Sequence, residues 1–172
     1  MGKRVKAGLI LLGALYCIYH FQTSGTKWHF IDNADLFVHE VGHFVFAPFG
    51  EFMAVAGGSL FQLLVPVAFF GYFTWSDQKF SAAAMLLWLS VNFFYVAVYA
   101  ADALKMELPL VGGEGVIHDW NYLLLNTGLI RHAQTVSNTI YFLGLVSIFT
   151  ALYLTWVNMN KQESSAENWN RI

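Results

Sequence analysis

Apolar residues along this chain gather in five stretches. Four of the stretches are long, and they cover residues 5–21, 52–75, 80–100 and 139–157. Their lengths bracket the roughly 20 residues that a helix needs to cross a bilayer. The fifth stretch, residues 34–52, is shorter and carries several polar side chains. The pattern predicts an all-α, polytopic integral membrane protein with about four to five membrane helices plus a short or re-entrant segment.

We expect residues 1–160 to form a single membrane-embedded helical domain. Residues 161–172, at the end of "NKQESSAENWNRI", read as a polar C-terminal tail that frays. The segment between the last two long stretches contains most of the remaining polar residues. It combines a Gly-rich loop with a short apolar run, "NYLLLNTGLI".

Composition supports the membrane assignment. Hydrophobic residues make up 57% of the chain and charged residues 12%, whereas a soluble domain has about 25% charged residues. The 16 Phe, 8 Tyr and 6 Trp suit contact with lipid and with the membrane interface. A net charge of -2 without an extended basic run argues against nucleic acid as a partner. The single cysteine, Cys17, excludes an internal disulfide and a Cys-based zinc finger.

The N-terminal stretch predicts the orientation of the chain. Lys3, Arg4 and Lys6 precede it, and no clean cleavage site follows it, so we interpret it as a retained signal anchor. The positive-inside rule then places the N-terminus in the cytoplasm. His20 ends this stretch and is expected at the membrane interface.

The short stretch carries the candidate chemistry in "HEVGH". His39 and His43 are four residues apart, so on a helix they share one face. Two imidazoles bind zinc from one side and leave room for a third ligand and a water, whose proton the Glu40 carboxylate takes. Ionisable groups in an apolar segment are costly and mark function. A structural pair of histidines is the alternative. "DNAD", residues 32–35, predicts a helix start near residue 33.

A third ligand is expected from residues 100–130, meeting the motif of residues 34–50. The candidates are Asp102, Glu114, His118 and Asp119. The segment "GGEGVIHDW" is the best supplier, with one of His118 and Asp119 on the metal and the other orienting a ligand or the water. Asp119 as a helix N-cap is the alternative.

Topology limits how these segments can meet. If every apolar stretch crossed the membrane fully, the ligands would lie on opposite sides. Two arrangements bring them together: the short stretch returns through "FGEFMAVAGG", or "NYLLLNTGLI" dips inward. Either arrangement predicts a partly sunken, water-accessible pocket.

These residues carry a family likeness. "HEVGH" in an apolar helix, followed by "GGSLFQLLVP", resembles the membrane-embedded zinc metalloproteases of the site-2 protease clan, and "VYAADALKMELPLVGGEGVIHDWNYLL" is similar to their downstream half. The resemblance is to small bacterial relatives, which implies the bacterial inner membrane. It also implies that His39 and His43 bind zinc, that Glu40 is the general base, and that an aspartate on a later helix is the third ligand. The Asp-Gly pair that carries this aspartate in the clan is missing here.

The expected function is therefore zinc-dependent hydrolysis of peptide bonds. The expected substrates are transmembrane or membrane-associated proteins, and the expected surroundings are membrane lipid. The alternative is a metal-binding membrane protein without protease activity, with a role in metal handling or assembly. Zinc is expected from the two imidazoles, although other divalent metals accept the same ligands.

Overall fold

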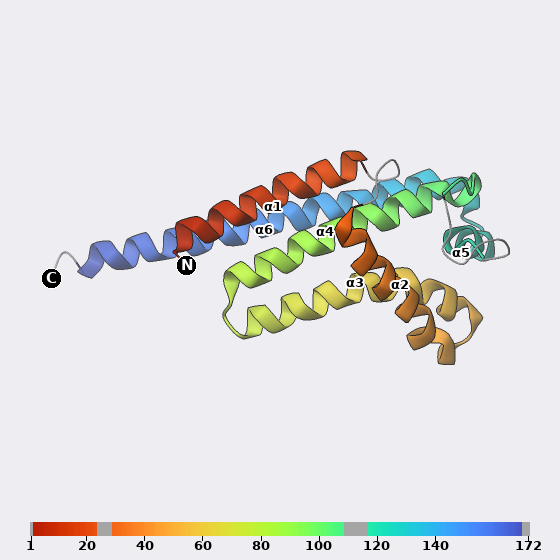
Figure 1. The fold of residues 1–172 in the computed structure, drawn as a ribbon, viewed down its shortest axis with the longest axis horizontal. Helices are drawn as coiled ribbons and strands as arrows, with labels where there is room; N and C mark the ends of the chain where they lie inside the picture. Colours follow the sequence, from red (N-terminus) through yellow and green to blue (C-terminus); the bar gives the residue numbers. More distant parts are fainter. Residues whose placement is uncertain (1, 24–28, 109–116, 170–172) are drawn as a thin grey trace.

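The computed structural model describes residues 2–23, 29–108 and 117–169, with side chains up to residue 160. This part of the chain is helical and contains no strand (Figure 1). Its α-helices are α1 (Lys3–Thr23), α2 (Phe30–Phe46), α3 (Glu51–Trp75), α4 (Lys79–Ala101), α5 (Asp119–Asn126) and α6 (Ala133–Trp169), and its short 3-10 helices are η1 (Ala47–Phe49), η2 (Asp102–Leu104) and η3 (Ile130–His132).

Four segments are long and apolar enough to cross a membrane. They are Lys3–Thr23, Glu51–Trp75, Lys79–Leu104 and Ile130–Asn160. They correspond to the four long apolar stretches, which confirms the prediction of an all-α polytopic membrane protein. Helix α2 carries most of the fifth stretch and is too short to be among them.

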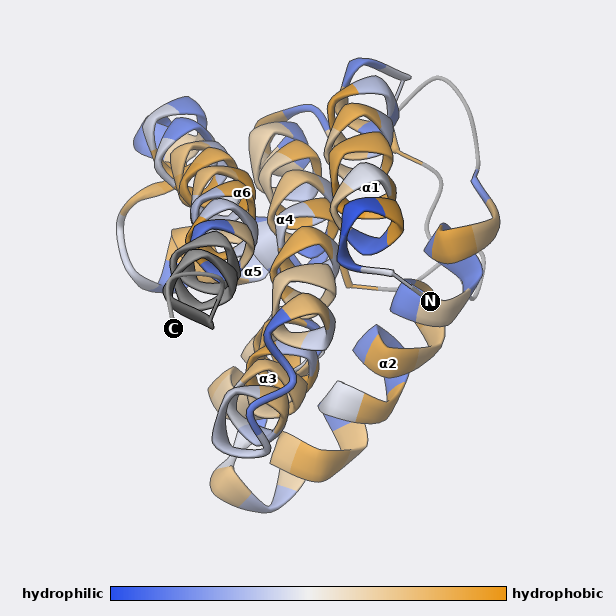
Figure 2. Ribbon diagram, turned by 90° about the vertical axis from the view of Figure 1, so that its left-hand side faces the viewer, coloured by the Kyte–Doolittle hydropathy of each residue, from blue (hydrophilic) through white to orange (hydrophobic). Residues whose placement is uncertain are grey.

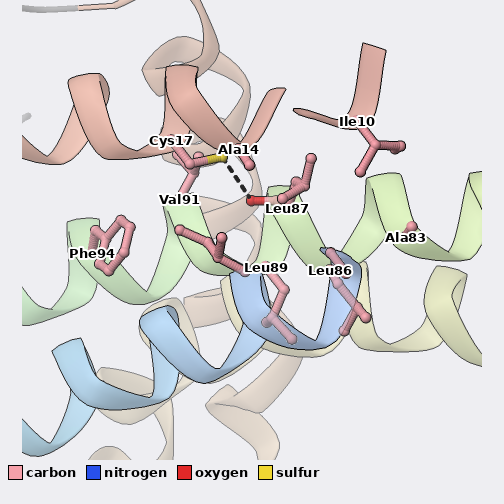
Figure 3. Close-up of a cluster of buried hydrophobic side chains, with 11 residues drawn as sticks. Ile10, Ala14, Cys17, Ala83, Leu86, Leu87, Leu89, Val91 and Phe94 are labelled. Atoms are coloured by element: carbon pink, nitrogen blue, oxygen red, sulfur yellow. Dashed lines mark hydrogen bonds between the residues drawn. The ribbon is translucent and has the colours of Figure 1, made fainter. Parts of the chain in front are cut away.

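Helix α4 is the centre of the bundle. Figure 2 shows it between α1, α6 and α3. In its most apolar part, 61% of the residues are buried, against 22% in the corresponding part of α1. In Figure 3, Ala14 and Cys17 of α1 face Leu87 and Val91 of α4, and the Cys17 thiol donates a hydrogen bond to the Leu87 carbonyl. The outer faces of the bundle carry large exposed apolar side chains, as expected where lipid replaces water as the solvent.

The start of α2 lies three residues before the predicted one, and this corrects our expectation. His29 is the N-cap, and its backbone N–H donates to Asp32 Oδ2 at 2.6 Å. Asp32 therefore lies inside the first turn, where it accepts the N-cap backbone N–H as in a capping box, and not ahead of the helix.

Two other expectations concern His20 and the C-terminal tail. His20 is fully buried, and its Nε2 lies 2.7 Å from Asp32 Oδ1; its place at the membrane interface stays a prediction. The predicted frayed tail is helical as far as Trp169, and its Lys, Gln, Glu and Ala residues are good helix formers.

Helices α2 and α3 form a tight hairpin that creates the site. The chain reverses through η1, which contains Pro48, and through Gly50, whose φ of 97° is in the left-handed region that favours glycine. The two helices then touch along their backbones. A Cβ added to Gly42 would lie 2.3 Å from the Gly57 carbonyl oxygen, and one added to Gly57 would lie 2.5 Å from that of Gly42. The chain thus turns back through "FGEFMAVAGG", in line with the first of the two expected arrangements.

Candidate metal centre

Helix α2 presents His39 and His43 toward α3, where each ring finds an acceptor for one nitrogen. His39 Nδ1 lies 3.1 Å from Gln62 Oε1, and His43 Nδ1 lies 2.8 Å from the Ala54 carbonyl oxygen. Both partners accept hydrogen bonds, so each Nδ1 carries the proton in the neutral ring. The second nitrogen, Nε2, is then left with a lone pair.

Asp119, the first residue of α5, meets these two nitrogens. Its Oδ2 lies 2.9 Å from His39 Nε2 and 3.4 Å from His43 Nε2. The ligand atoms of the three residues lie within 4.8 Å of one another. Three lone-pair-bearing atoms therefore point at the same place, which is favourable only with a cation or bound protons between them. We call His39, His43 and Asp119 the metal centre, because this group can hold a metal ion.

Electrostatics keep the third residue in its ligand form. Burial raises the pKa of Asp119, but the His39 and His43 rings that face its Oδ2 outweigh this effect, so the pKa lies below its ordinary value. The Asp119 carboxylate, whose Oδ2 lies 3.4 Å from His43 Nε2, raises the pKa of His43 against the effect of burial. Asp119 is therefore a carboxylate near neutral pH, and a metal ion must displace any proton on His43.

His118 and Asp102 lie beside this group but are committed to each other and to the backbone. His118 is the N-cap of α5: its Nδ1 accepts the Asn121 backbone N–H at 3.2 Å, and its Nε2 lies 3.2 Å from Asp102 Oδ2. The structure thus brings three of the four predicted metal ligands together and places His118 outside the group. The cap is His118 rather than Asp119. Glu114 lies outside the described residues.

Several contacts hold Asp119 in place. Asn121 donates to the Ala103 carbonyl oxygen at 2.8 Å, which ties α5 to η2, directly after α4. The Asp119 backbone N–H donates to the Tyr99 hydroxyl at 3.1 Å, and Trp120 Nε1 donates to Ser59 Oγ at 3.1 Å. Helix α5 is a separate segment of the chain, and these contacts fix it against both α3 and α4.

Sequence reasoning missed Gln62 and Tyr99 as supporting residues. Gln62 had a usable signal, because it is a polar residue in the middle of a membrane-length apolar run. Tyr99 had none, because one more aromatic residue in α4 looks like packing until α5 is placed against it.

Glu40 lies next to the metal centre with its carboxylate uncommitted. It is half-buried, and it makes no hydrogen bond or ion pair within the part of the chain that the structure describes. It acts electrostatically on His43. The His43 side chain is 26% exposed, against 7% for His39 and 9% for Asp119, so the centre is most accessible on the side of His43.

Gly58 makes room for both imidazoles. A Cβ at this position would lie 2.5 Å from His39 Nε2 and 2.7 Å from His43 Nε2. These nitrogens face Asp119. The rings cannot move away from the added Cβ without breaking the hydrogen bonds of their Nδ1 atoms.

We expect Gly58→Ala to weaken metal binding by about 10- to 100-fold, the range found when groups that support metal ligands are changed. The added methyl would displace the ligand nitrogens. The measurement is competition of the purified protein with a chromophoric chelator. Gly71→Ala is the matched control, because it lies in the same helix with nothing within 4 Å of the added Cβ. Equal metal affinity in both variants would contradict this role for Gly58.

Comparison of the chain with protein-family models, with curated proteins and with solved structures finds no match.

Proposed function

We propose that this protein is a membrane-embedded zinc metallopeptidase. The proposal is carried by one observation: two imidazole Nε2 atoms and one carboxylate oxygen converge on a point, beside the uncommitted Glu40. Two histidines and one carboxylate form a ligand set found in catalytic zinc sites, which keep one position open for water or substrate. The likeness of "HEVGH" and its surroundings to the site-2 protease clan supports the same proposal.

In this proposal His39, His43 and Asp119 hold the ion, and their partners orient them. Zinc, when bound there, supplies Lewis acidity toward water and toward a peptide carbonyl. Gln62 and the Ala54 carbonyl fix the ring orientation of the two histidines. Glu40 takes the proton from the attacking water and passes it to the leaving amine. Water and substrate reach the centre from the side of His43, the most exposed of the three ligands.

The proposed substrates are transmembrane or membrane-associated proteins. The centre is built from helices packed against membrane-length segments, so a substrate already in the bilayer can reach it. We further propose the bacterial inner membrane as the location, with Lys3, Arg4 and Lys6 holding the N-terminus in the cytoplasm.

A second candidate is a metal-binding membrane protein that does not hydrolyse peptides. The burial of His39 and Asp119, 5% and 6% exposed, favours it, because structural and ion-handling sites are closed around the ion. The uncommitted Glu40 favours the peptidase, since a closed site has no use for a free carboxylate.

Metal removal tests the proposal. The protein, purified in detergent and loaded with zinc, would be incubated with a library of transmembrane peptides, and the products read by mass spectrometry. We expect cleavage that stops when a chelator strips the ion and returns when zinc is restored. Cleavage that persists in the stripped protein would contradict a metallopeptidase, and stoichiometric zinc without any cleavage would favour the second candidate.

A further inference from the structure

A second buried polar cluster lies on α2, one helical turn before the metal centre. Its central residue is Asp35, whose side chain is fully buried. One carboxyl oxygen, Oδ1, accepts a hydrogen bond from Trp88 Nε1 at 2.7 Å. The other, Oδ2, is buried and has no hydrogen-bond partner among the described residues.

Asn92 adds a second orphaned oxygen. It is also fully buried, and its Nδ2 donates to the Trp88 carbonyl oxygen at 3.0 Å. Its side chain reaches the Asp35 carboxyl, yet its Oδ1 has no donor within the described part of the chain. Buried acceptors without a donor cost free energy comparable to a lost hydrogen bond. Each of the two oxygens thus lacks a hydrogen-bond donor.

The charges around Asp35 leave it without a counter-ion of its own. On α2, Asp32 repels its negative charge, and on α1, His20 attracts it. His20 Nε2, however, lies 2.7 Å from Asp32 Oδ1, so this basic group already serves the other carboxylate. Tyr16 of α1 and Tyr95 of α4 also face the cluster, and phenols are neutral near pH 7.

We propose that Asp35 is a proton-binding site, at which the carboxyl of the folded protein carries a hydrogen on its buried Oδ2. The hydrogen converts the orphaned acceptor Oδ2 into a donor. It also removes an unpaired charge from a fully buried position. A divalent metal ion fits less well, because the described His, Asp, Glu and Cys residues gather in a ligand group at the metal centre and not here.

The proton affinity of this carboxyl agrees with that assignment. Burial raises the pKa of Asp35 to about 6, although the side chains of Trp88 and Asn92 oppose the shift. An aspartate in an unfolded chain titrates near about 3.9. The folded state therefore binds the proton more tightly. The resulting stability is fully present below about pH 4 and is lost as the pH rises through about 6. Proton binding at Asp35 thus stabilises the folded protein in acid.

Infrared spectroscopy of the lipid-reconstituted full chain tests the site. A protonated carboxylic acid has a carbonyl band separate from that of a carboxylate, and the band shifts in heavy water. We expect wild type to show such a band at about pH 5 that fades as the pH rises through about 6. The band should be absent in Asp35→Asn and retained in Asp77→Asn, whose carboxyl is 84% exposed.

Trp88→Phe provides an independent check if Asp35→Asn does not fold. It removes the hydrogen bond that stabilises the carboxylate, so the fading of the band should move to higher pH. Thermal melting gives a further readout. The melting temperature of Asp35→Asn minus that of wild type should increase as the pH is raised from about 5 to about 8. A wild-type spectrum without an Asp35-dependent band at about pH 5, or a fading pH unchanged by Trp88→Phe, would overturn the assignment.

Discussion

His43→Ala and Asp119→Ala are expected to abolish metal binding, whereas His118→Asn should leave it intact. Wild type should carry about one metal ion per chain, since the three ligand atoms converge on one point. Loss of a supporting group alone costs about 10- to 100-fold in affinity, and loss of a ligand removes a bond to the metal itself. Elemental mass spectrometry of the purified proteins measures the stoichiometry.

The His118 variant is the informative control. His118 neighbours Asp119 in sequence, but its nitrogens are used by Asn121 and Asp102. Asparagine is a good N-cap, so His118→Asn keeps the start of α5 while removing the imidazole. If this variant lost its metal as completely as Asp119→Ala, the ligand set read from the structure would be wrong. Retention of metal by Asp119→Ala would lead to the same conclusion.

Glu40→Gln should reduce peptide hydrolysis by about 10²- to 10⁴-fold, the usual contribution of a general base. The amide keeps the size of the side chain but cannot take a proton from water. Metal content should not change, because Glu40 is not among the three converging residues. The measurement pairs turnover of a cleaved transmembrane peptide with zinc stoichiometry for the same preparation.

This pairing separates the two candidate functions. A peptidase loses turnover and keeps its zinc. A metal-handling or structural site should respond to His39 or His43 replacement and tolerate Glu40→Gln. Turnover that survives in Glu40→Gln would exclude the proposed proton transfer, and zinc loss in this variant would show that Glu40 supports the ion instead.

The local pattern of the sequence predicted the membrane helices and two residues of the metal centre. Runs of apolar residues determine which segments can enter lipid, because every backbone group there must be satisfied within a helix. The spacing of His39 and His43 determines that they share a face, because the α-helix has a fixed period. The position of Glu40 beside them follows from the same geometry.

The tertiary structure alone decided which of His118 and Asp119 joins His39 and His43. His118 and Asp119 are adjacent in the chain, and both are competent ligands, so sequence could not choose between them. The choice follows from the docking of α5 on η2 and α3 through Asn121 and Trp120, which turns Asp119 toward α2 and leaves His118 as the cap.

The same holds for three further features of the structure. The space at Gly58, the acceptor at Gln62 and the unpaired oxygen of Asp35 all depend on which side chains meet across helices. Hydrophobic pattern and helical period are properties of a segment by itself, so the sequence determined the spans and the "HEVGH" face. Contacts between segments far apart in the chain depend on packing and on which polar groups satisfy one another. Only the assembled bundle therefore determined that Asp119 joins His39 and His43 and that an oxygen of Asp35 is left unpaired.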